Sequence, residues 1–163
     1  MKNKNFLEQE FISLVKQYER VIYNVCTFYV SETSPIEDLY QEIVLNLWKA
    51  FPNFRNESQT STWIYRIALN TCISDLRRNV KLRKNVPLSF SEHIIFEQDT
   101  QSGEIQELYS RIYKLNKMER SIILLWLEER SYQEIADITG FSVVNVATRL
   151  KRTKEKLKNM SNQ

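Results

Sequence analysis

Residues 131–158 read SYQEIADITGFSVVNVATRLKRTKEKLK and decide how the C-terminal part of this chain folds. Ser131 and Glu134 have the spacing of a capping box, in which each side chain accepts a hydrogen bond from the other residue's backbone N–H. Gly140 marks the end of that helix, because glycine readily adopts the left-handed conformation that closes many helices. Ser142 then caps another helix. The segment therefore predicts two short helices joined by a glycine turn.

The second of these helices is predicted to have one apolar and one cationic face. The residues expected on its buried side are Val143, Val146, Ala147 and Leu150. The residues expected on its exposed side are Asn145, Thr148, Arg149, Lys151 and Arg152. Two short helices around a tight turn, the second of them basic, are typical of the helix-turn-helix motif that reads duplex DNA in the major groove. An ordinary helical hairpin with a solvated charged face is the alternative.

The composition favours helices over tight β-turns. Only two of the 163 residues are glycine and three are proline, and a chain of this length can bury one moderate core or two small ones. No apolar run approaches the ~20 residues that span a bilayer, and Glu8 and Glu10 interrupt any signal-peptide pattern. We therefore expect a cytoplasmic protein without membrane insertion. Cys26 and Cys72 lie in apolar helical patterns, which favours reduced buried thiols over a disulfide.

The net charge of +3 is unevenly distributed. Residues 1–60 hold six Lys and Arg against eight Asp and Glu, whereas residues 61–90 hold six against Asp75 alone. From residue 145 onward, another six basic residues face only Glu155. Two separate basic clusters suit a polyanion that is contacted at two places. Because cations near helix C-termini also complement the helix dipole, charge alone does not decide the function.

Helical periodicity begins near residue 5 and is interrupted at residues 31–34. Ser34, Pro35 and Glu37 then predict a helix start, with a serine cap, a proline in the first helical position and a capping-box glutamate. The residues that this helix is expected to bury are Leu39, Ile43, Leu47 and Trp48. It should end by Phe51, because Pro52 disfavours helix at the residue before it.

A third helix is predicted from Ser61 or Thr62 to about Asn79. The pattern then fails over residues 81–103, a stretch too long for a loop inside a compact domain, so we expect a flexible linker. Periodicity resumes at residue 104. Asn116, with Glu119 three residues later, predicts another capped helix that reaches residue 127.

The predicted fold class is therefore all-α, with two small helical domains at residues 5–80 and 104–159. Signals of catalysis are weak: His93 is the only histidine, which excludes a Ser-His-Asp arrangement and a multi-histidine metal site. There is no glycine-rich phosphate loop. Asp38 and Glu42 lie one turn apart, but such a pair on an amphipathic helix is far more often a solvated or partner-binding face. We expect no catalytic residues, no metal and no cofactor.

Aromatic, amide and cationic side chains alternate along the third predicted helix. They are Trp63, Tyr65, Arg66, Asn70, Arg77 and Arg78. This combination suits unstacked bases, because rings offer a stacking face, amides read base edges and cations hold phosphate. Trp63 is in register with Ile67 and so fits the core better than a stacking platform. Asn70 and the arginine pair are the better candidates for contact.

Three segments in this order resemble an RNA polymerase sigma factor of the extracytoplasmic-function type (ECF, sigma-70 family group IV). They are residues 38–48 (DLYQEIVLNLW), 62–78 (TWIYRIALNTCISDLRR) and 132–157. The resemblance implies that the N-terminal domain is sigma region 2, a bundle of three to four helices, and that the C-terminal domain is the region 4 helix-turn-helix. It also implies that the first segment docks on the clamp of core RNA polymerase. The polar side chains of this segment fall on one strip of its helix beside the apolar row. The polymerase-binding candidates on this polar strip are Asp38, Gln41, Glu42 and Asn46.

The resemblance further implies two contacts with promoter DNA. Region 2 would capture a base flipped out of the minus-10 element. Flipping a base costs a few kcal/mol of stacking free energy. The linker would thread into polymerase. The candidates for the minus-10 contact are Thr62, Arg66, Asn70, Arg77 and Arg78. The last helix would enter the major groove at the minus-35 element, where its candidates for DNA contact are Ser142, Asn145, Thr148, Arg149, Lys151 and Arg152. Of its cations, Arg152 and Lys154 are better placed for the DNA backbone than for bases.

One departure from the family pattern concerns this last helix. Family members often carry a Gly-Thr pair before the valine of the recognition helix and an arginine just after it. This chain has Val144-Asn145 and Ala147 at those positions. The loss of that arginine puts any minus-35 consensus taken from the family in doubt.

The sequence thus predicts a non-enzymatic sigma subunit whose partners are core RNA polymerase, promoter DNA and an anti-sigma factor. One alternative is a stand-alone helix-turn-helix regulator whose N-terminal domain senses a ligand or dimerises. Another is an adaptor that uses the helical surface around Trp48. The base-reading pattern of residues 62–78 argues against the regulator, because a duplex-only binder does not need it. The basic helix at the C-terminus argues against the adaptor.

Overall fold

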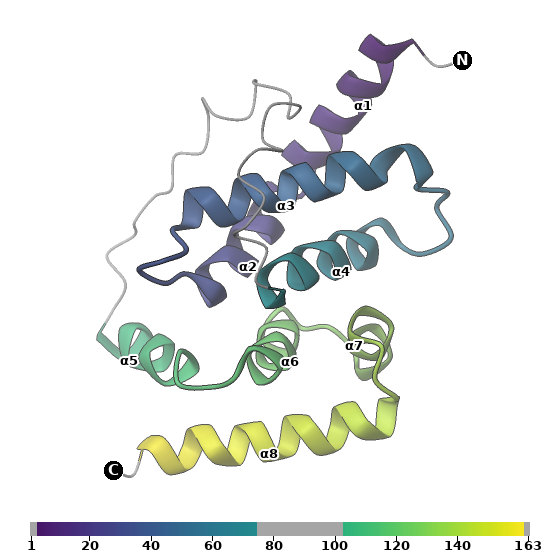
Figure 1. Ribbon diagram of the computed structural model, residues 1–163. Helices are drawn as coiled ribbons and strands as arrows, with labels where there is room; N and C mark the ends of the chain where they lie inside the picture. Colours follow the sequence, from purple (N-terminus) through teal and green to yellow (C-terminus); the bar gives the residue numbers. More distant parts are fainter. Residues whose placement is uncertain (1–2, 75–102, 162–163) are drawn as a thin grey trace. The chain divides into compact units, whose positions relative to one another are not determined.

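The computed structural model describes residues 3–74 and 103–161. Within these residues the chain is helical, and its β-structure is limited to one isolated bridge between Ser31 and Ser34. The chain divides into two compact units, Met1–Gln98 and Asp99–Gln163, here called the N-terminal and C-terminal units (Figure 1). The predicted all-α fold class with two helical domains is confirmed for the described residues. Apart from Gly103, the predicted linker at 81–103 lies outside them.

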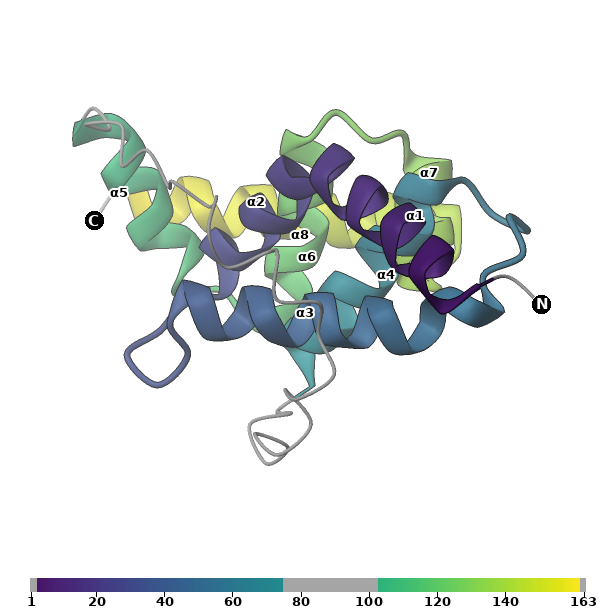
Figure 2. The ribbon, with the colours of Figure 1, turned by 90° about the horizontal axis from the view of Figure 1, so that it is seen from above.

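In the N-terminal unit, α2, α3 and α4 pack against one another, and α1 packs on α2. The elements are α1 (Lys4–Gln17), α2 (Glu19–Tyr29), α3 (Ile36–Ala50), the 3-10 turn η1 (Phe51–Asn53) and α4 (Thr60–Ile73). Figure 2 shows α1 running obliquely to α3. Phe11 of α1 is fully buried there, with its ring 5.0 Å from that of Trp48 and 5.3 Å from that of Phe51. Burial of a phenylalanine side chain contributes roughly 1.5–3 kcal/mol, so this contact fixes α1.

The first helical segment bends at Tyr18, which the sequence pattern did not predict. Tyr18 has φ −107° and ψ 15°, outside the helical range. The hydrogen bonds on either side survive: the Tyr18 N–H donates to the Leu14 carbonyl at 3.1 Å, and the Ile22 N–H donates to the Tyr18 carbonyl at 3.0 Å. The residue at the bend is neither proline nor glycine, so the sequence carries no helix-breaking signal there.

The predicted start of α3 is wrong in detail. Pro35 is the N-cap residue rather than the first helical residue, and among the described residues no side chain caps this helix. The reason is a tight turn before it, in which the backbones of Ser31 and Ser34 exchange two hydrogen bonds of 3.1 Å. That turn fixes Ser34 outside the helix, so the predicted box between Ser34 and Glu37 does not form.

The predicted end of α3 by Phe51 is confirmed, although the residue before Pro52 does not adopt an extended backbone conformation. Phe51 keeps a helical backbone, with φ −57° and ψ −41°, and opens the 3-10 turn that contains the proline. The next helix, α4, begins at Thr60 and ends at Ile73, earlier than predicted, because Ser74 is extended at φ −78° and ψ 132°. The Ser74 hydroxyl and N–H both donate to the Asn70 carbonyl, at 2.5 and 2.9 Å.

Cys26 and Cys72 both carry reduced, buried thiols, as predicted. Burial raises the pKa of the Cys26 thiol well above its usual range, and the nearby Cys72 adds to the rise. A thiol held neutral in this way is a poor nucleophile. Burial likewise raises the pKa of Tyr40, with a further contribution from Glu19. These groups belong to the core of the N-terminal unit.

In the C-terminal unit, the long last helix supports the other three. The elements are α5 (Gly103–Ile112), α6 (Lys117–Leu127), α7 (Tyr132–Thr139) and α8 (Val143–Ser161). Helix α8 contacts α5, α6 and α7, and α6 also contacts α7. The fully buried side chains at the centre of this unit include Ile122, Leu124, Leu125, Ile135 and Val146.

Both capping boxes predicted in the C-terminal unit are confirmed. Asn116 and Glu119 exchange hydrogen bonds of 2.9 and 3.0 Å at the start of α6. Ser131 and Glu134 do the same at the start of α7, at 3.1 and 2.7 Å. The left-handed Gly140 that closes α7 is also confirmed, with φ 81°.

The predicted burial along α8 is correct at two positions and differs at several others. Val146 and Leu150 are buried as predicted, but Val143 is 38% exposed because the chain enters the helix there, ahead of the packed turns. Ala147 is half-buried, and so is Asn145, which was expected on the exposed side. Thr153 is buried although the sequence pattern did not single it out, and its hydroxyl donates to the Arg149 carbonyl at 2.8 Å.

Candidate nucleic-acid interface

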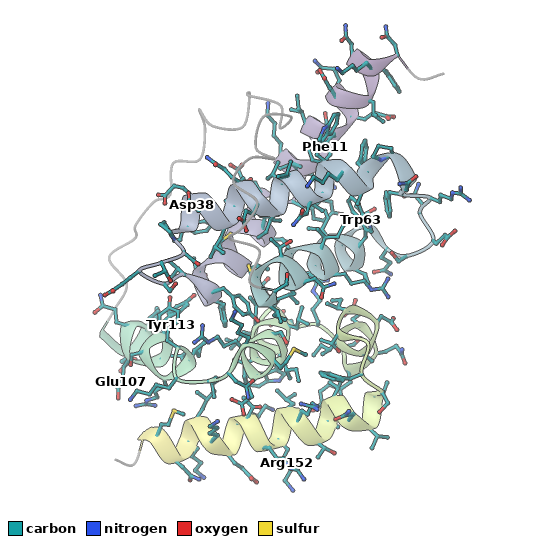
Figure 3. All side chains as sticks on the ribbon, viewed as in Figure 1. Phe11, Asp38, Trp63, Glu107, Tyr113 and Arg152 are labelled. Carbon is teal, nitrogen blue, oxygen red and sulfur yellow. The ribbon has the colours of Figure 1, made fainter. Side chains whose placement is uncertain are left out.

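The outward face of α8 carries four exposed polar side chains of the predicted set: Thr148, Arg149, Lys151 and Arg152. Val146, Leu150 and Thr153 form the buried row that packs the helix onto its own unit. Thr148, Lys151 and Arg152 lie on the opposite side of the helix, and Arg149 lies at the flank of the buried row. Arg152 points away from the neighbouring helices α6 and α7 (Figure 3). Among the described residues, the first turn of α8 contains no acidic side chain. The face is therefore suited to phosphate and base edges.

Two other cations of α8 stabilise the unit itself. The Lys154 ammonium lies 4.0 Å from the ring centroid of Trp126 on α6. The Lys156 ammonium lies 3.2 Å from a carboxylate oxygen of Glu119, the capping-box residue of α6. Both contacts hold α8 against α6, so the basic cluster of this helix divides into structural cations and outward-facing ones.

Arg149 is held in place by two neighbours. Its guanidinium lies 4.3 Å from the ring centroid of Phe141, the residue after the glycine turn. Its Nε–H donates to Oδ1 of Asn145 at 2.9 Å. Arginine presents five N–H donors in a rigid fork, so with Nε engaged the two terminal nitrogens remain for a ligand. Paired terminal N–H groups match O6 and N7 of guanine.

The same contact limits Asn145. A bidentate pair with adenine needs both the carbonyl oxygen and the amide NH₂ of an asparagine side chain, and here the oxygen already accepts from Arg149. The backbone N–H of Asn145 donates to the hydroxyl of Ser142 at 3.1 Å, which is the predicted cap of α8. Ser142 and Asn145 therefore position the start of the helix and Arg149. The Thr148 hydroxyl, in turn, donates to the Val144 carbonyl at 3.1 Å.

Val144 also belongs to this face, although its sequence position marked it only as a departure from the family pattern and not as a candidate for contact. It is 77% exposed on the first turn of α8. The signal that could have found it is its difference from the glycine that is frequent at this position in the family it resembles. Phe141 was also not predicted. Its contact with Arg149 joins residues eight positions apart across a turn, and helical periodicity does not indicate such a contact.

On α4, the predicted residues separate into three groups. Arg66 and Asn70 are exposed and lie one turn apart on one side of the helix. Thr62 is buried, with 7% of its surface exposed, so its side chain does not join them. Arg77 and Arg78 lie outside the described residues.

Trp63 is neither a core residue nor an open platform. Its ring is half-buried and stacks on that of Phe54, with 4.4 Å between centroids and 24° between planes. Figure 3 shows its place near the start of α4. The stack fastens the segment between η1 and α4 onto the helix.

A groove of about 690 Å³ lies beside this segment, between α1 and residues 51–60. The residues that line it include Glu10, Leu14, Phe51, Phe54, Asn56 and Thr60. The lining includes the rings of Phe51 and Phe54 and the amide of Asn56, and Glu10 adds a carboxylate. A neutral heterocycle suits such a lining better than a phosphate does.

The polar strip on α3 is uneven. Gln41 is exposed, whereas Asp38 and Glu42 are half-buried; Figure 3 labels Asp38 near the start of the helix. Asn46 differs from them, because its amide donates to the Thr71 hydroxyl at 2.9 Å and so ties α3 to α4. The Thr71 hydroxyl donates onward to the Ile67 carbonyl at 2.7 Å. Asn46 therefore has a structural role.

Within the part of the chain that the structure describes, no group of histidine, cysteine and acidic side chains could hold a metal ion. No helix among the described residues is long and apolar enough to cross a membrane.

Two family models match this chain in succession. Residues 14–81 match sigma-70 region 2, and residues 105–157 match sigma-70 region 4. RNA polymerase sigma factor YlaC of Bacillus subtilis is 30% identical over 97% of this chain and 93% of that protein. The ECF RNA polymerase sigma-E factor of Haemophilus influenzae is 28% identical over 93% of this chain and 87% of its own length.

A solved structure of CnrH in complex with the cytosolic domain of CnrY is similar in fold. It covers 99% of this chain and 90% of its own, with a TM-score of 0.63 and 20% sequence identity. At this identity the likeness concerns the fold alone.

Proposed function

The chain belongs to the extracytoplasmic-function group of sigma-70 factors, which direct promoter-specific transcription initiation, and from this premise we propose a division of labour between its two units. The N-terminal unit docks on core RNA polymerase and reads the minus-10 element as single strand. The C-terminal unit reads the minus-35 element as duplex. The observation that carries this proposal is the outward face of α8. There a ring contact and a hydrogen bond hold the Arg149 guanidinium in place, and Lys151 and Arg152 are exposed on the same helix.

At the minus-35 element, α8 is the recognition helix. Arg149 is the base-reading residue, and its terminal N–H groups donate to a guanine. Asn145 and Phe141 act through it as positioning residues, supported by the 2.9 Å hydrogen bond and the 4.3 Å ring contact. Lys151 and Arg152 contact the phosphate backbone, which adds affinity without sequence preference.

At the minus-10 element, the exposed Arg66 and Asn70 of α4 face the melted strand. The groove beside residues 51–60 receives an extruded base, which its apolar and amide lining supports. Thr62 does not take part through its side chain, since it is buried. A preformed pocket offsets part of the cost of unstacking at one sequence only, which makes strand opening selective.

Docking on polymerase uses the polar edge of α3, with the exposed Gln41 and the half-buried Asp38 and Glu42. Asn46 supports this edge indirectly through Thr71. An anti-sigma factor is a further partner of the chain. This expectation is supported by the similar fold of CnrH, which was solved with the cytosolic domain of CnrY bound.

Reconstituted transcription tests the proposal. The purified chain is mixed with core RNA polymerase and promoter DNA, and specific run-off transcripts and strand opening are scored. We expect both to require the chain and the polymerase together. If the chain alone binds duplex DNA tightly and polymerase adds nothing, a stand-alone regulator explains the data better.

Single substitutions separate the proposed contacts. Asn70→Ala should impair opening at the minus-10 element and leave the affinity for core polymerase unchanged, with Asn5→Ala on the exposed side of α1 as the control. Gln41→Ala should weaken binding to polymerase, whereas Lys49→Ala at the other end of α3 should not. Equal loss of opening and of polymerase binding in Asn70→Ala would point to misfolding.

A further inference from the structure

The second residue of α8, Val144, presents an apolar side chain on an otherwise polar surface. Its exposed fraction of 77% is the largest among the exposed large apolar side chains of the described residues, and that of Val143 next to it is 38%. Valine is also a weak helix former, and here it buries little against its own unit. Folding therefore does not explain a valine at this position.

The surroundings of Val144 restrict what can cover it. Thr148 is exposed one turn further along and commits its hydroxyl proton to the Val144 carbonyl. Arg149, Lys151 and Arg152 are exposed on the same helix. Duplex DNA matches both properties, because its phosphates pair with the cations and its major groove contains one apolar group, the 5-methyl of thymine.

We propose that Val144 packs against the 5-methyl group of a thymine in the minus-35 element and thereby selects that base. The inference rests on the proposed function, in which α8 enters the major groove. Residues in the N-terminal part of a recognition helix contact base edges, and Val144 is in the first turn of α8. Arg149 then reads a guanine by hydrogen bonds, while Val144 reads a thymine by apolar contact.

Replacement of thymine by deoxyuridine tests this directly, because it deletes only the methyl group. The holoenzyme of the full chain and core polymerase first selects duplexes from a pool randomised over the minus-35 region. Each thymine of the selected duplex is then replaced in turn. We expect one replacement to weaken binding about fourfold, the factor that corresponds to burial of one methyl group. With Val144→Ala, the thymine and uracil duplexes should bind alike.

Two variants serve as controls. Val143→Ala makes the same substitution at the neighbouring residue and should keep the wild-type ratio between the two duplexes. Lys151→Ala should weaken binding to both equally. Because alanine is a better helix former than valine, Val144→Ala should fold, and thermal melting followed by circular dichroism verifies this.

The inference is overturned by a selected element that contains no thymine, by the absence of any effect of uracil at every position, or by an unchanged ratio in Val144→Ala. It is also overturned if Val144→Ala weakens assembly with core polymerase in the absence of DNA, because the valine then serves a protein partner. If the holoenzyme enriches no sequence from the pool, the proposed function itself fails. The two failures are thus distinguishable.

Discussion

The two units set the starts of their helices in different ways. In the C-terminal unit, side chains of Asn116, Ser131 and Ser142 accept hydrogen bonds at the starts of α6, α7 and α8. In the described part of the N-terminal unit, none of the helices α1 to α4 begins with a side-chain cap. Its boundaries depend instead on backbone turns and on aromatic packing. Local sequence thus specifies the C-terminal unit, and long-range contacts specify the N-terminal one.

If this contrast holds, the largest effect on stability comes from the aromatic core of the N-terminal unit. Phe11→Ala removes a fully buried ring that contacts Trp48 and Phe51. Such a truncation costs about 3–5 kcal/mol. Hydrogen exchange should show reduced protection in α2 and α3 and unchanged protection in α6 and α8.

The matched control for this prediction is Phe6→Ala on the same helix. Phe6 is 52% exposed, so its truncation should change stability by less than about 0.5 kcal/mol. Equal effects of the two substitutions, or an equal loss of protection in both units, would contradict the contrast.

The same contrast explains how far the sequence predicts the fold. The boxes of Ser131 with Glu134 and of Asn116 with Glu119 each lie within three residues, so their hydrogen bonds could be read directly from the spacing. Gly140 was predictable for the same reason. The bend at Tyr18 was not, since no residue there breaks a helix. Ser34 misled the prediction because a neighbouring backbone turn, rather than its own side chain, decides where α3 begins.

In the candidate site, too, features set by local sequence were predictable and contacts between distant residues were not. Exposure of Arg149, Lys151 and Arg152 follows from helical periodicity and was predicted. The bracing of Arg149 by Phe141 joins two elements across a turn, and the hydrogen bond from Asn46 joins residues 25 positions apart. Periodicity places such residues only on a solvated helix face or in a turn, and their contacts can be identified only from the fold.

The glycine turn of the C-terminal unit provides the next largest effect. Gly140→Ala should destabilise this unit by about 1–2 kcal/mol, because a left-handed φ of 81° is unfavourable for any residue with a Cβ. The added methyl meets nothing within 4 Å, so steric contact does not contribute. Gly103→Ala is the control, since that glycine also has open space around it and starts α5. Thermal melting should show a loss for the first variant only; a loss for both would mean that the backbone conformation is not the cause.

Removal of a cap tests the contrast most directly. Ser131→Ala should cost about 1 kcal/mol, because the N–H of Glu134 loses its acceptor. Ser34→Ala should leave stability unchanged, because its backbone alone forms the turn before α3. The measurement is chemical denaturation with exchange protection in α7 and α3 as separate reporters. A loss of similar size in both variants would mean that the N-terminal unit also uses local caps.

The smallest effect separates the two kinds of cation on α8. Lys156→Ala removes a partly exposed ion pair with Glu119, with side-chain exposures of 46% and 24%, and should cost about 0.2–1 kcal/mol of stability. Salt should diminish this cost, because exposed charges are screened. Lys151→Ala should leave stability within about 0.5 kcal/mol and instead reduce the salt slope of DNA binding by about 1. The two lysines lie on one helix in one basic cluster, so opposite outcomes in melting and in salt titration would assign Lys156 to folding and Lys151 to phosphate. A reduced salt slope in Lys156→Ala would remove that distinction and extend the DNA contact toward the end of α8.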